Sequence, residues 1–493
     1  MTNPTDNTTN SAESAGANVP ELSKSQADEG AALGRASSFS LDVERKTTID
    51  ALRGWWNNVR SGEPGALPAI LGLVVLAIIF AQVSGEFFTQ YNIGNLPGQA
   101  AYISIIAMGL IFVLLLGEID LSGGTTGGMC AGFAVQILVG GNLKDGVPGG
   151  LYWAVLVFML AMAVLGFFLR SITGPVIVVV GVLIGFFGLG SGSELVAMIF
   201  AVAAGCAVGI FVGWLVAVVR IPSFIVTLAL FLAFQGVLLF ALQSQPKKVN
   251  DYNLFNKLAN ANLSPTASWI FTIVVVGGFV AFTLVRALLS IRKRVAGEGI
   301  DLVLVRGAVV AIIAVLITIA ANDNRNPLPF GTLEGIPYAA AVPIVLMILV
   351  TTVLNHTSWG RHLYATGGNA EAARRAGINV THIRVTAFTM SSGFAALGGL
   401  FLASSVGAVT LALGGANVLL FSVAAAVIGG TSLFGGRGKP RDALLGALVI
   451  AIIPNGIGLR PDLGPEYQYV VTGLVLLVAA SVDALSRRRA RTA

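Results

Sequence analysis

Long apolar stretches separated by short polar segments make up most of the chain from residue 67 onward. A helix that crosses a bilayer needs about 20 mostly apolar residues, with about 17 as the lower limit. Fourteen stretches are candidates: 67–84, 99–116, 124–140, 151–170, 174–190, 195–219, 223–243, 268–290, 302–321, 338–355, 385–411, 418–434, 442–458 and 468–485. Several are short enough to be half-helices or re-entrant segments. The pattern predicts an all-α polytopic membrane protein with about 10–14 transmembrane helices and a membrane domain over 61–486.

Composition agrees with this pattern. Apolar residues make up 55% of the 493 residues and charged residues 11%, against roughly 25% charged in a typical soluble domain. The net charge of +6 could indicate nucleic acid or an anionic membrane surface. Because the basic excess lies in loops between apolar stretches, we expect membrane lipid and no nucleic acid as a partner. Cys130 and Cys206 both lie inside apolar stretches, so no disulfide framework is predicted.

The loop charges give an orientation. Residues 1–60 are polar and rich in Ser, Thr, Asn and Ala, which predicts a disordered cytoplasmic tail, and 487–493 form a second cytoplasmic tail. With both termini inside and strict alternation of the spans, the cytoplasmic side past residue 60 holds eighteen Lys and Arg, and the external side holds six. Since cytoplasmic loops collect positive charge, the bias supports a multi-pass protein with both termini in the cytoplasm.

The first segment with candidate chemistry is 117–124, which lies between two apolar stretches and contains Glu118, Asp120, Ser122 and Gly123. Carboxylates near membrane depth are costly, so they normally have a partner or a water-filled cavity. Two interpretations stay open for Asp120 and Ser122. Either side chain could cap the next helix by accepting backbone N–H bonds, or the segment could line or gate a solute path, and the two can coexist.

A second segment, 429–436, repeats the spacing of the first. The residues that match at a constant offset are Gly117, Leu121, Gly123 and Gly124 with Gly429, Leu433, Gly435 and Gly436. Glycine is common in this chain, so chance is one explanation. If the repeat is real, it predicts two related halves with a solute path between them, and it adds Thr431 and Ser432 to the path or gate.

The third segment is the long cytoplasmic loop 356–384, which is expected to contain a short, capped helix. Asn369 suits the N-cap and Gly377 the C′ position, with Glu371 in the first turn and basic residues in the last. Such a charged helix between two spans suits contact with a cytoplasmic partner. The predicted contact residues are Gly368, Asn369, Glu371, Ala372, Arg374, Arg375 and Gly377.

Catalytic motifs are missing from the sequence. There is no phosphate loop, nucleophile elbow or H-E-x-x-H pattern, so an enzyme is not predicted, and any ATP that drives transport binds another chain. The three histidines, His356, His362 and His382, share one loop but have the wrong spacing for a metal site. We therefore expect no metal and no cofactor in this chain.

Three motifs carry a family resemblance: EIDLSG at 118–123, YATGGNAEAARRAGI at 364–378 and AAVIGGTSLFGG at 425–436. Together they resemble the permease subunits of bacterial ABC sugar importers, in the group that takes up ribose, xylose, arabinose and galactose. The resemblance covers roughly 67–485, and the length and extra spans are similar to xylose permeases. The sequence departs from the common pattern at Gly124-Thr125-Thr126, where a glycine-valine pair often follows the serine, and in its long N-terminal tail.

The resemblance implies the ABC importer permease fold, the bacterial cell membrane and a set of partners. Two permease subunits would pair, an ATPase would dock on each cytoplasmic loop helix, and an external sugar-binding protein would deliver the substrate. Residues 369–377 become the coupling helix, and 117–124 become part of the gate or path.

Alternative functions are an ABC permease for nucleosides, a signalling sugar derivative or branched-chain amino acids, or an ion-coupled secondary transporter working alone. A secondary transporter is expected to place ionisable residues along its spans. Glu118 and Asp120 lie at a boundary and Arg306 lies near a span end, which favours a permease driven by a partner.

Overall fold

The computed structural model describes residues 49–50, 53–54, 57, 65–186, 192–293, 299–326 and 331–492. The predicted tail over 1–60 lies outside these residues apart from 49–50, 53–54 and 57. The predicted second tail continues the last helix as far as Thr492.

Each of the fourteen apolar stretches forms a helix, because a backbone in lipid must satisfy its hydrogen bonds within the segment. The helices are α3 (Leu67–Val83), α4 (Gln90–Leu115), α5 (Gly123–Gly140), α7 (Gly149–Phe168), α8 (Thr173–Phe186), α9 (Glu194–Trp214) with the π-helical turn η1 (Leu215–Val219), α10 (Ser223–Ala241), α12 (Pro265–Arg292), α13 (Ile300–Asn322), α14 (Tyr338–His356), α17 (Val380–Val406), α18 (Ala416–Ile428), α19 (Pro440–Gly458) and α20 (Pro465–Thr492). Short helices in the connections are α6 (Leu143–Gly146), α11 (Asn253–Asn260), α15 (Ser358–Gly368) and α16 (Ala370–Arg375).

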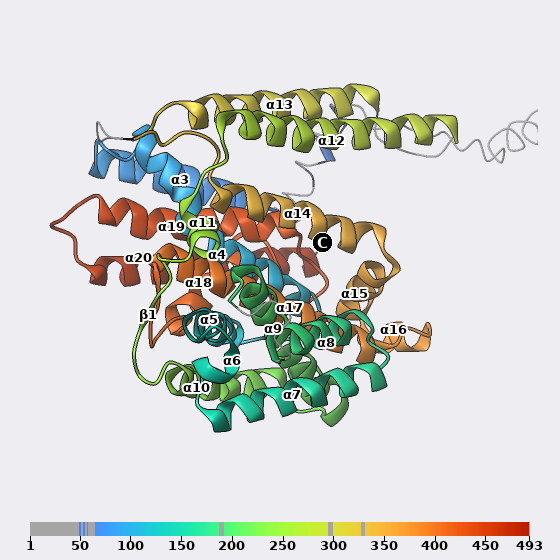
Figure 1. Cartoon of the computed structure of the whole chain (residues 1–493). Helices are drawn as coiled ribbons and strands as arrows, with labels where there is room; N and C mark the ends of the chain where they lie inside the picture. Colours follow the sequence, from blue (N-terminus) through green and yellow to red (C-terminus); the bar gives the residue numbers. More distant parts are fainter. Residues whose placement is uncertain are drawn as a thin grey trace, which may run out of the picture.

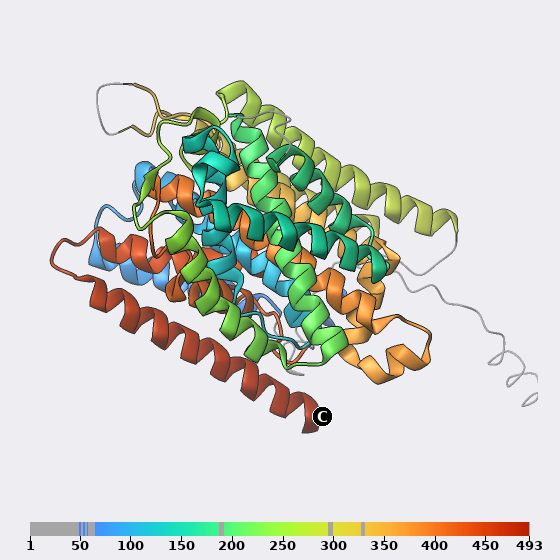
Figure 2. The same ribbon diagram turned by 60° about the horizontal axis from the view of Figure 1, so that its bottom comes forward.

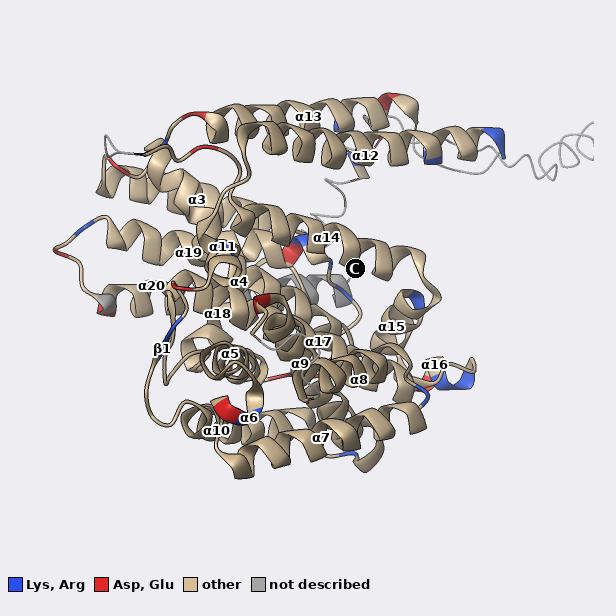
Figure 3. Ribbon diagram, in the orientation of Figure 1, with Lys and Arg blue, Asp and Glu red and all other residues tan. Residues whose placement is uncertain are grey.

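Among the described residues, nine helices are long and apolar enough to cross a membrane: α4, α7, α9 with η1, α10, α12, α13, α14, α17 and α19. The shorter apolar helices are α3, α8, α18 and the first part of α20. The prediction of an all-α polytopic membrane protein is confirmed. Charged residues lie mostly at helix ends and in connections (Figure 3).

The helices divide into a buried centre and an apolar periphery. In α4 and in α17, 83% of the most apolar window is buried, whereas only 11% is buried in α12 and 17% in α13. The pair α12–α13 runs along one edge of the bundle, next to α14, while α17 lies among α4, α5 and α9 (Figure 1). Apolar side chains that face outward on the peripheral helices are expected to contact lipid.

A stripe of glycines lets α9 approach α17 closely. Gly205, Gly209 and Gly213 recur every four residues, on one face of α9. A Cβ atom on Gly209 would lie 2.4 Å from the carbonyl oxygen of Phe388, and one on Gly205 would lie 2.6 Å from that of Ser392. Small residues at such contacts are how membrane helices gain packing energy, because lipid offers no hydrophobic gain.

Two polar contacts tie helices together at the end opposite α15 and α16. Asn92 of α4 and Asn455 of α19 donate to one another's side-chain oxygens at 3.0 and 2.8 Å, and both are buried. The two-residue strands β1 (Lys247–Lys248) and β2 (Ala408–Val409) pair antiparallel, with Lys247 opposite Val409. This pairing fastens the connection between α10 and α11 to the end of α17.

Candidate functional site

Three connections meet at one end of the bundle, which we call the basic end: 116–122, 356–379 and 429–439. Gly436 donates its N–H to the carbonyl oxygen of Leu115, at the end of α4, over 2.9 Å. The hydroxyl of Tyr364 in α15 donates to the carbonyl oxygen of Gly438 over 2.7 Å. These bonds bring all three sequence motifs to one junction, on the side of the bundle where α15 and α16 project (Figure 2).

Glycine permits this junction. A Cβ on Gly367 of α15 would lie 1.8 Å from the carbonyl oxygen of Leu115, and one on Gly435 would lie 2.9 Å from that of Gly367. Gly117 has a φ of 74° and Gly435 a φ of 87°, in the left-handed region that glycine adopts without steric cost. The backbones of three separate segments therefore touch directly.

The segment 117–122 is held from two sides. Glu118 forms a part-buried ion pair with Arg384 of α17, with 3.4 Å between Oε1 and Nη2. The N–H of Ile119 donates to the Ser223 hydroxyl over 3.2 Å, and the hydroxyl of Thr227 donates to the Ile119 carbonyl oxygen over 3.3 Å. Contacts with α10 and α17 thus set the position of this connection relative to two candidate spans.

Asp120 is almost fully buried, and hydroxyl and amide groups surround its carboxyl. It accepts from the backbone N–H of Ser122 at 2.9 Å, from the Ser122 hydroxyl at 2.7 Å and from the Ser391 hydroxyl of α17 at 3.2 Å. Burial raises the pKa of this carboxyl above its usual range, and the three hydrogen bonds oppose that rise. Of the two capping candidates, Asp120 binds a backbone N–H at the helix start, whereas Ser122 sits at the N-cap of α5 without a capping bond.

The repeated spacing does not mark the same backbone at the two places. Gly123 and Gly124 lie inside α5, whereas their matches, Gly435 and Gly436, have φ values of 87° and 75° in a loop. Gly117 has a φ of 74°, but its match, the residue after α18, has a φ of −62°. The spacing therefore gives no support to two related halves, which stay a prediction.

Thr431 and Ser432, the two hydroxyl residues assigned to the path with that repeat, are buried at the junction beneath this loop. Ser432 accepts the N–H of Phe434, and its own N–H donates to the carbonyl oxygen of Arg437. The Thr431 hydroxyl is buried and has no partner among the described residues. Both side chains are placed to hold the loop, and their role in the path stays a prediction.

The predicted capped helix is confirmed as α16, and α15 precedes it directly. The Asn369 side chain accepts from the N–H groups of Glu371 and Ala372 at 3.1 and 2.9 Å. Gly377 has a φ of 83°, and its N–H donates to the carbonyl oxygen of Arg374, which ends the helix as the sequence predicts.

The charges of α16 pair within the helix. Glu371 binds Arg374 at 2.8 Å and Arg375 at 3.2 Å, and all three side chains are more than half exposed. The division of this loop into α15 and α16 was not predicted from the sequence. Through Tyr364 and Gly367, α15 joins this exposed helix to the buried junction.

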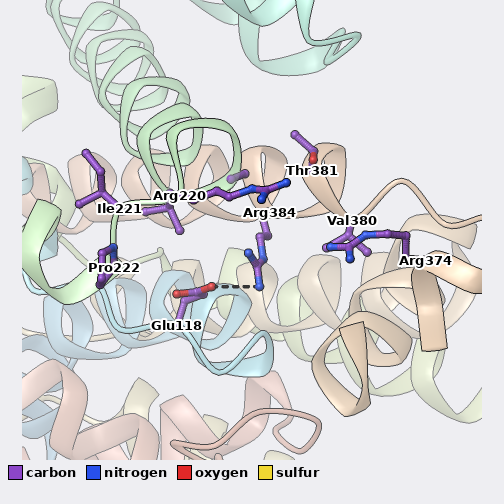
Figure 4. A pocket seen from close by; sticks show the side chains of 10 residues that line it. Glu118, Arg220, Ile221, Pro222, Arg374, Val380, Thr381 and Arg384 are labelled. Atoms are coloured by element: carbon purple, nitrogen blue, oxygen red, sulfur yellow. Dashed lines mark ion pairs between the residues drawn. The ribbon is translucent and has the colours of Figure 1, made fainter. Parts of the chain in front are cut away.

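A cavity of about 580 Å³ opens at the basic end beside this junction. Its lining residues come from four segments: Glu118, Val216, Ala217, Arg220, Ile221, Pro222, Arg374, Val380, Thr381 and Arg384. Figure 4 shows Glu118 facing Arg384, with Arg220 beside them and Arg374 farther along the wall.

Of the predicted site residues, Glu118 and Arg374 line this cavity. Asp120, Ser122 and Gly123 are buried in packing next to it. Arg220 and Arg384 were not among the predicted site residues, although both are basic residues near predicted span ends. Nothing in their local sequence indicates a shared cavity, because the segments that bring them together are far apart in the chain.

Within the part of the chain that the structure describes, no three His, Cys, Asp or Glu side chains gather closely enough to hold a metal ion.

Comparison with known proteins agrees with the motifs. A family model described as the permease component of branched-chain amino acid transport systems matches residues 173–480. The xylose transport system permease of Haemophilus influenzae is 31% identical over 427 residues, which cover 86% of this chain and 98% of the relative. The chain belongs to the ABC sugar-importer permease family.

Other relatives of the permease agree over most of its length. The xylose transport system permease of Escherichia coli is 28% identical over 445 residues, or 88% of this chain and 96% of the relative. The ribose import permease of the same species is 25% identical over 416 residues, or 84% of this chain and 92% of the relative. No solved structure matches the permease significantly. The family and the nine long apolar helices among the described residues make it a multi-pass membrane protein.

Proposed function

We propose that the chain is the membrane subunit of an ATP-driven importer for xylose or a related monosaccharide. Its relatives over nearly the whole length carry the names of xylose and ribose permeases. In the proposal, an external sugar-binding protein delivers the substrate, two permease subunits pair around the path, and a separate chain binds and hydrolyses ATP. No cofactor is held by the permease itself, and both termini lie in the cytoplasm.

The observation that carries the coupling proposal is the construction of α15 and α16. The exposed helix α16 presents charged side chains outward, and its caps make it a defined structure rather than a flexible loop. Helix α15 packs its glycine against the end of α4 and hydrogen-bonds the loop 432–438. A displacement of α16 by a bound ATPase would therefore be transmitted through α15 to the junction beside Glu118.

A second candidate is import of branched-chain amino acids, because the matching family model carries that description. The full-length relatives named above favour sugar over that candidate. Uptake of labelled xylose, ribose and leucine by cells that express the permease together with its ATPase and binding protein separates the two. Leucine uptake without sugar uptake would contradict the proposed substrate class.

Charge reversal on α16 tests the coupling role. Arg374→Glu together with Arg375→Glu breaks two exposed ion pairs with Glu371, each worth about 0.3–0.5 kcal/mol in a helix. The fold is expected to survive, while co-purification of the ATPase and sugar uptake are lost.

The matched control is the double reversal Arg292→Glu and Lys293→Glu, at the exposed end of α12, far from α16 in the fold. This control should keep both the ATPase and uptake. Normal uptake in the α16 variant, or equal losses in both variants, would reject α16 as the docking helix.

A further inference from the structure

The cavity at the basic end has surplus positive charge. Arg220, Arg374 and Arg384 line it, and Glu118 is the one acid among the lining residues that the structure describes. Glu118 already pairs with Arg384, and Arg374 pairs with Glu371, which does not line the cavity. Arg220 has no ion pair with a described residue. Because arginine stays protonated at any physiological pH, the cavity attracts an anion.

Donors remain free after these pairs are made. Arg384 uses one terminal nitrogen for Glu118, and its Nε is buried without a hydrogen-bond partner among the described residues. The buried Nε is closed off from the cavity, so a ligand would accept from the other terminal nitrogen, for which the structure gives no partner among the described residues. A guanidinium offers two parallel donors, which match two oxygens of a phosphate group.

The backbone places Arg220 unusually. It follows the π-helical turn η1 and has a φ of 68°, in a region that non-glycine residues rarely adopt. Such strain persists where the surrounding structure enforces it, and π-helical turns are frequent at functional sites. The result is a side chain that extends into the cavity beside Arg384 (Figure 4).

The first turn of α17 adds to the positive electrostatic potential in the cavity. Val380 and Thr381 line the cavity at the start of this 27-residue helix. The start of a helix carries partial positive charge from its aligned peptide dipoles and favours phosphate. Together with the arginines, it gives the cavity contacts for a doubly charged anion.

We propose that this cavity binds a phosphate group from the cytoplasm, carried by a phosphorylated sugar. A phosphate monoester has a charge of about −1.5 to −2 at pH 7, which offsets the surplus positive charge of the arginines that line the cavity. The volume of about 580 Å³ has room for the sugar as well as the phosphate. Because Arg374 belongs to α16 and Arg384 holds Glu118, the occupant links α16 to the segment 117–122. This consequence for transport rests on the proposed function, whereas binding does not.

The test is binding of ribose 5-phosphate to the purified full-length permease in detergent, measured by calorimetry. Ribose 5-phosphate should bind and ribose should not. Arg220→Gln should weaken binding about tenfold, since it removes one charge-assisted contact. Glu118→Gln should strengthen binding, because it frees Arg384 from its internal partner. The matched control, Arg361→Gln on the exposed face of α15, should leave binding unchanged.

A second arm separates two sources of phosphate. The permease in nanodiscs of phosphatidylcholine should bind ribose 5-phosphate, and added phosphatidylglycerol should not displace it. If phosphatidylglycerol displaces ribose 5-phosphate from the wild type but not from Arg220→Gln, the cavity binds a lipid headgroup and the sugar phosphate is overturned. Absence of binding, or equal binding by wild type, Arg220→Gln and Glu118→Gln, would overturn the site itself. Loss of binding when the ATPase is attached would assign the cavity to that interface instead. None of these measurements depends on sugar uptake, so their outcome stands even if the proposed import function is wrong.

Discussion

The junction at the basic end predicts opposite effects for two neighbouring glycines. A Cβ on Gly367 would lie 1.8 Å from the Leu115 carbonyl oxygen and 3.2 Å from the Gly436 nitrogen, while one on Gly368 meets nothing within 4 Å. Neither glycine has a positive φ, so space alone distinguishes them. Ordinary contact begins near 3.4 Å, which means that Gly367→Ala must move α15 by about 1.6 Å.

The size of the effect follows from what this movement breaks. Overpacking against a backbone that cannot rotate away costs about 1–3 kcal/mol. The shift also strains the bond of 2.7 Å from the Tyr364 hydroxyl to the Gly438 carbonyl oxygen, which adds about 1 kcal/mol. We expect Gly367→Ala to lose about 2–4 kcal/mol. Gly368→Ala should be neutral or gain up to about 1 kcal/mol, because alanine favours helix.

The assay is the thermal midpoint of each variant in detergent, followed by size-exclusion fluorescence, with ATPase co-purification as a second readout. Gly367→Ala should melt below the wild type and retain less ATPase, and Gly368→Ala should match the wild type in stability. Equal midpoints for the two variants would refute the close contact between α15 and the end of α4. A lower midpoint for Gly368→Ala alone would refute it as well.

Two further predictions concern buried polar groups. Asp120→Ala leaves three donors from Ser122 and Ser391 without their acceptor, so we expect a loss of roughly 2–4 kcal/mol and reduced uptake; wild-type uptake and melting would make Asp120 dispensable. Asn92→Ala and Asn455→Ala each leave a buried amide unpaired and should cost about 1–3 kcal/mol, measured by thermal midpoint. The double variant should cost clearly less than the sum, and simple additivity would show that the two amides are not coupled.

Local features of this protein were predictable from sequence because their causes are local. An apolar stretch of sufficient length must form a helix in lipid, and each of the fourteen stretches does so. Asn369 and Gly377 delimit α16 through bonds to residues two or three positions away. The matched glycine spacing at 117–124 and 429–436 does not mark matching backbone conformations. Identical residue types adopt different φ values once each backbone meets different neighbours.

The amino-acid sequence by itself therefore determined the membrane class, the helices, the caps of α16 and the family. The tertiary structure alone decided which helices are central, because lipid and protein interior are equally apolar, and hydropathy does not distinguish the buried α4 from the peripheral α12. It also decided that Glu118 meets Arg384, that Arg220 shares their cavity, and that Gly367 touches Leu115. These contacts join segments far apart in the chain, and only packing in three dimensions sets which side chains meet.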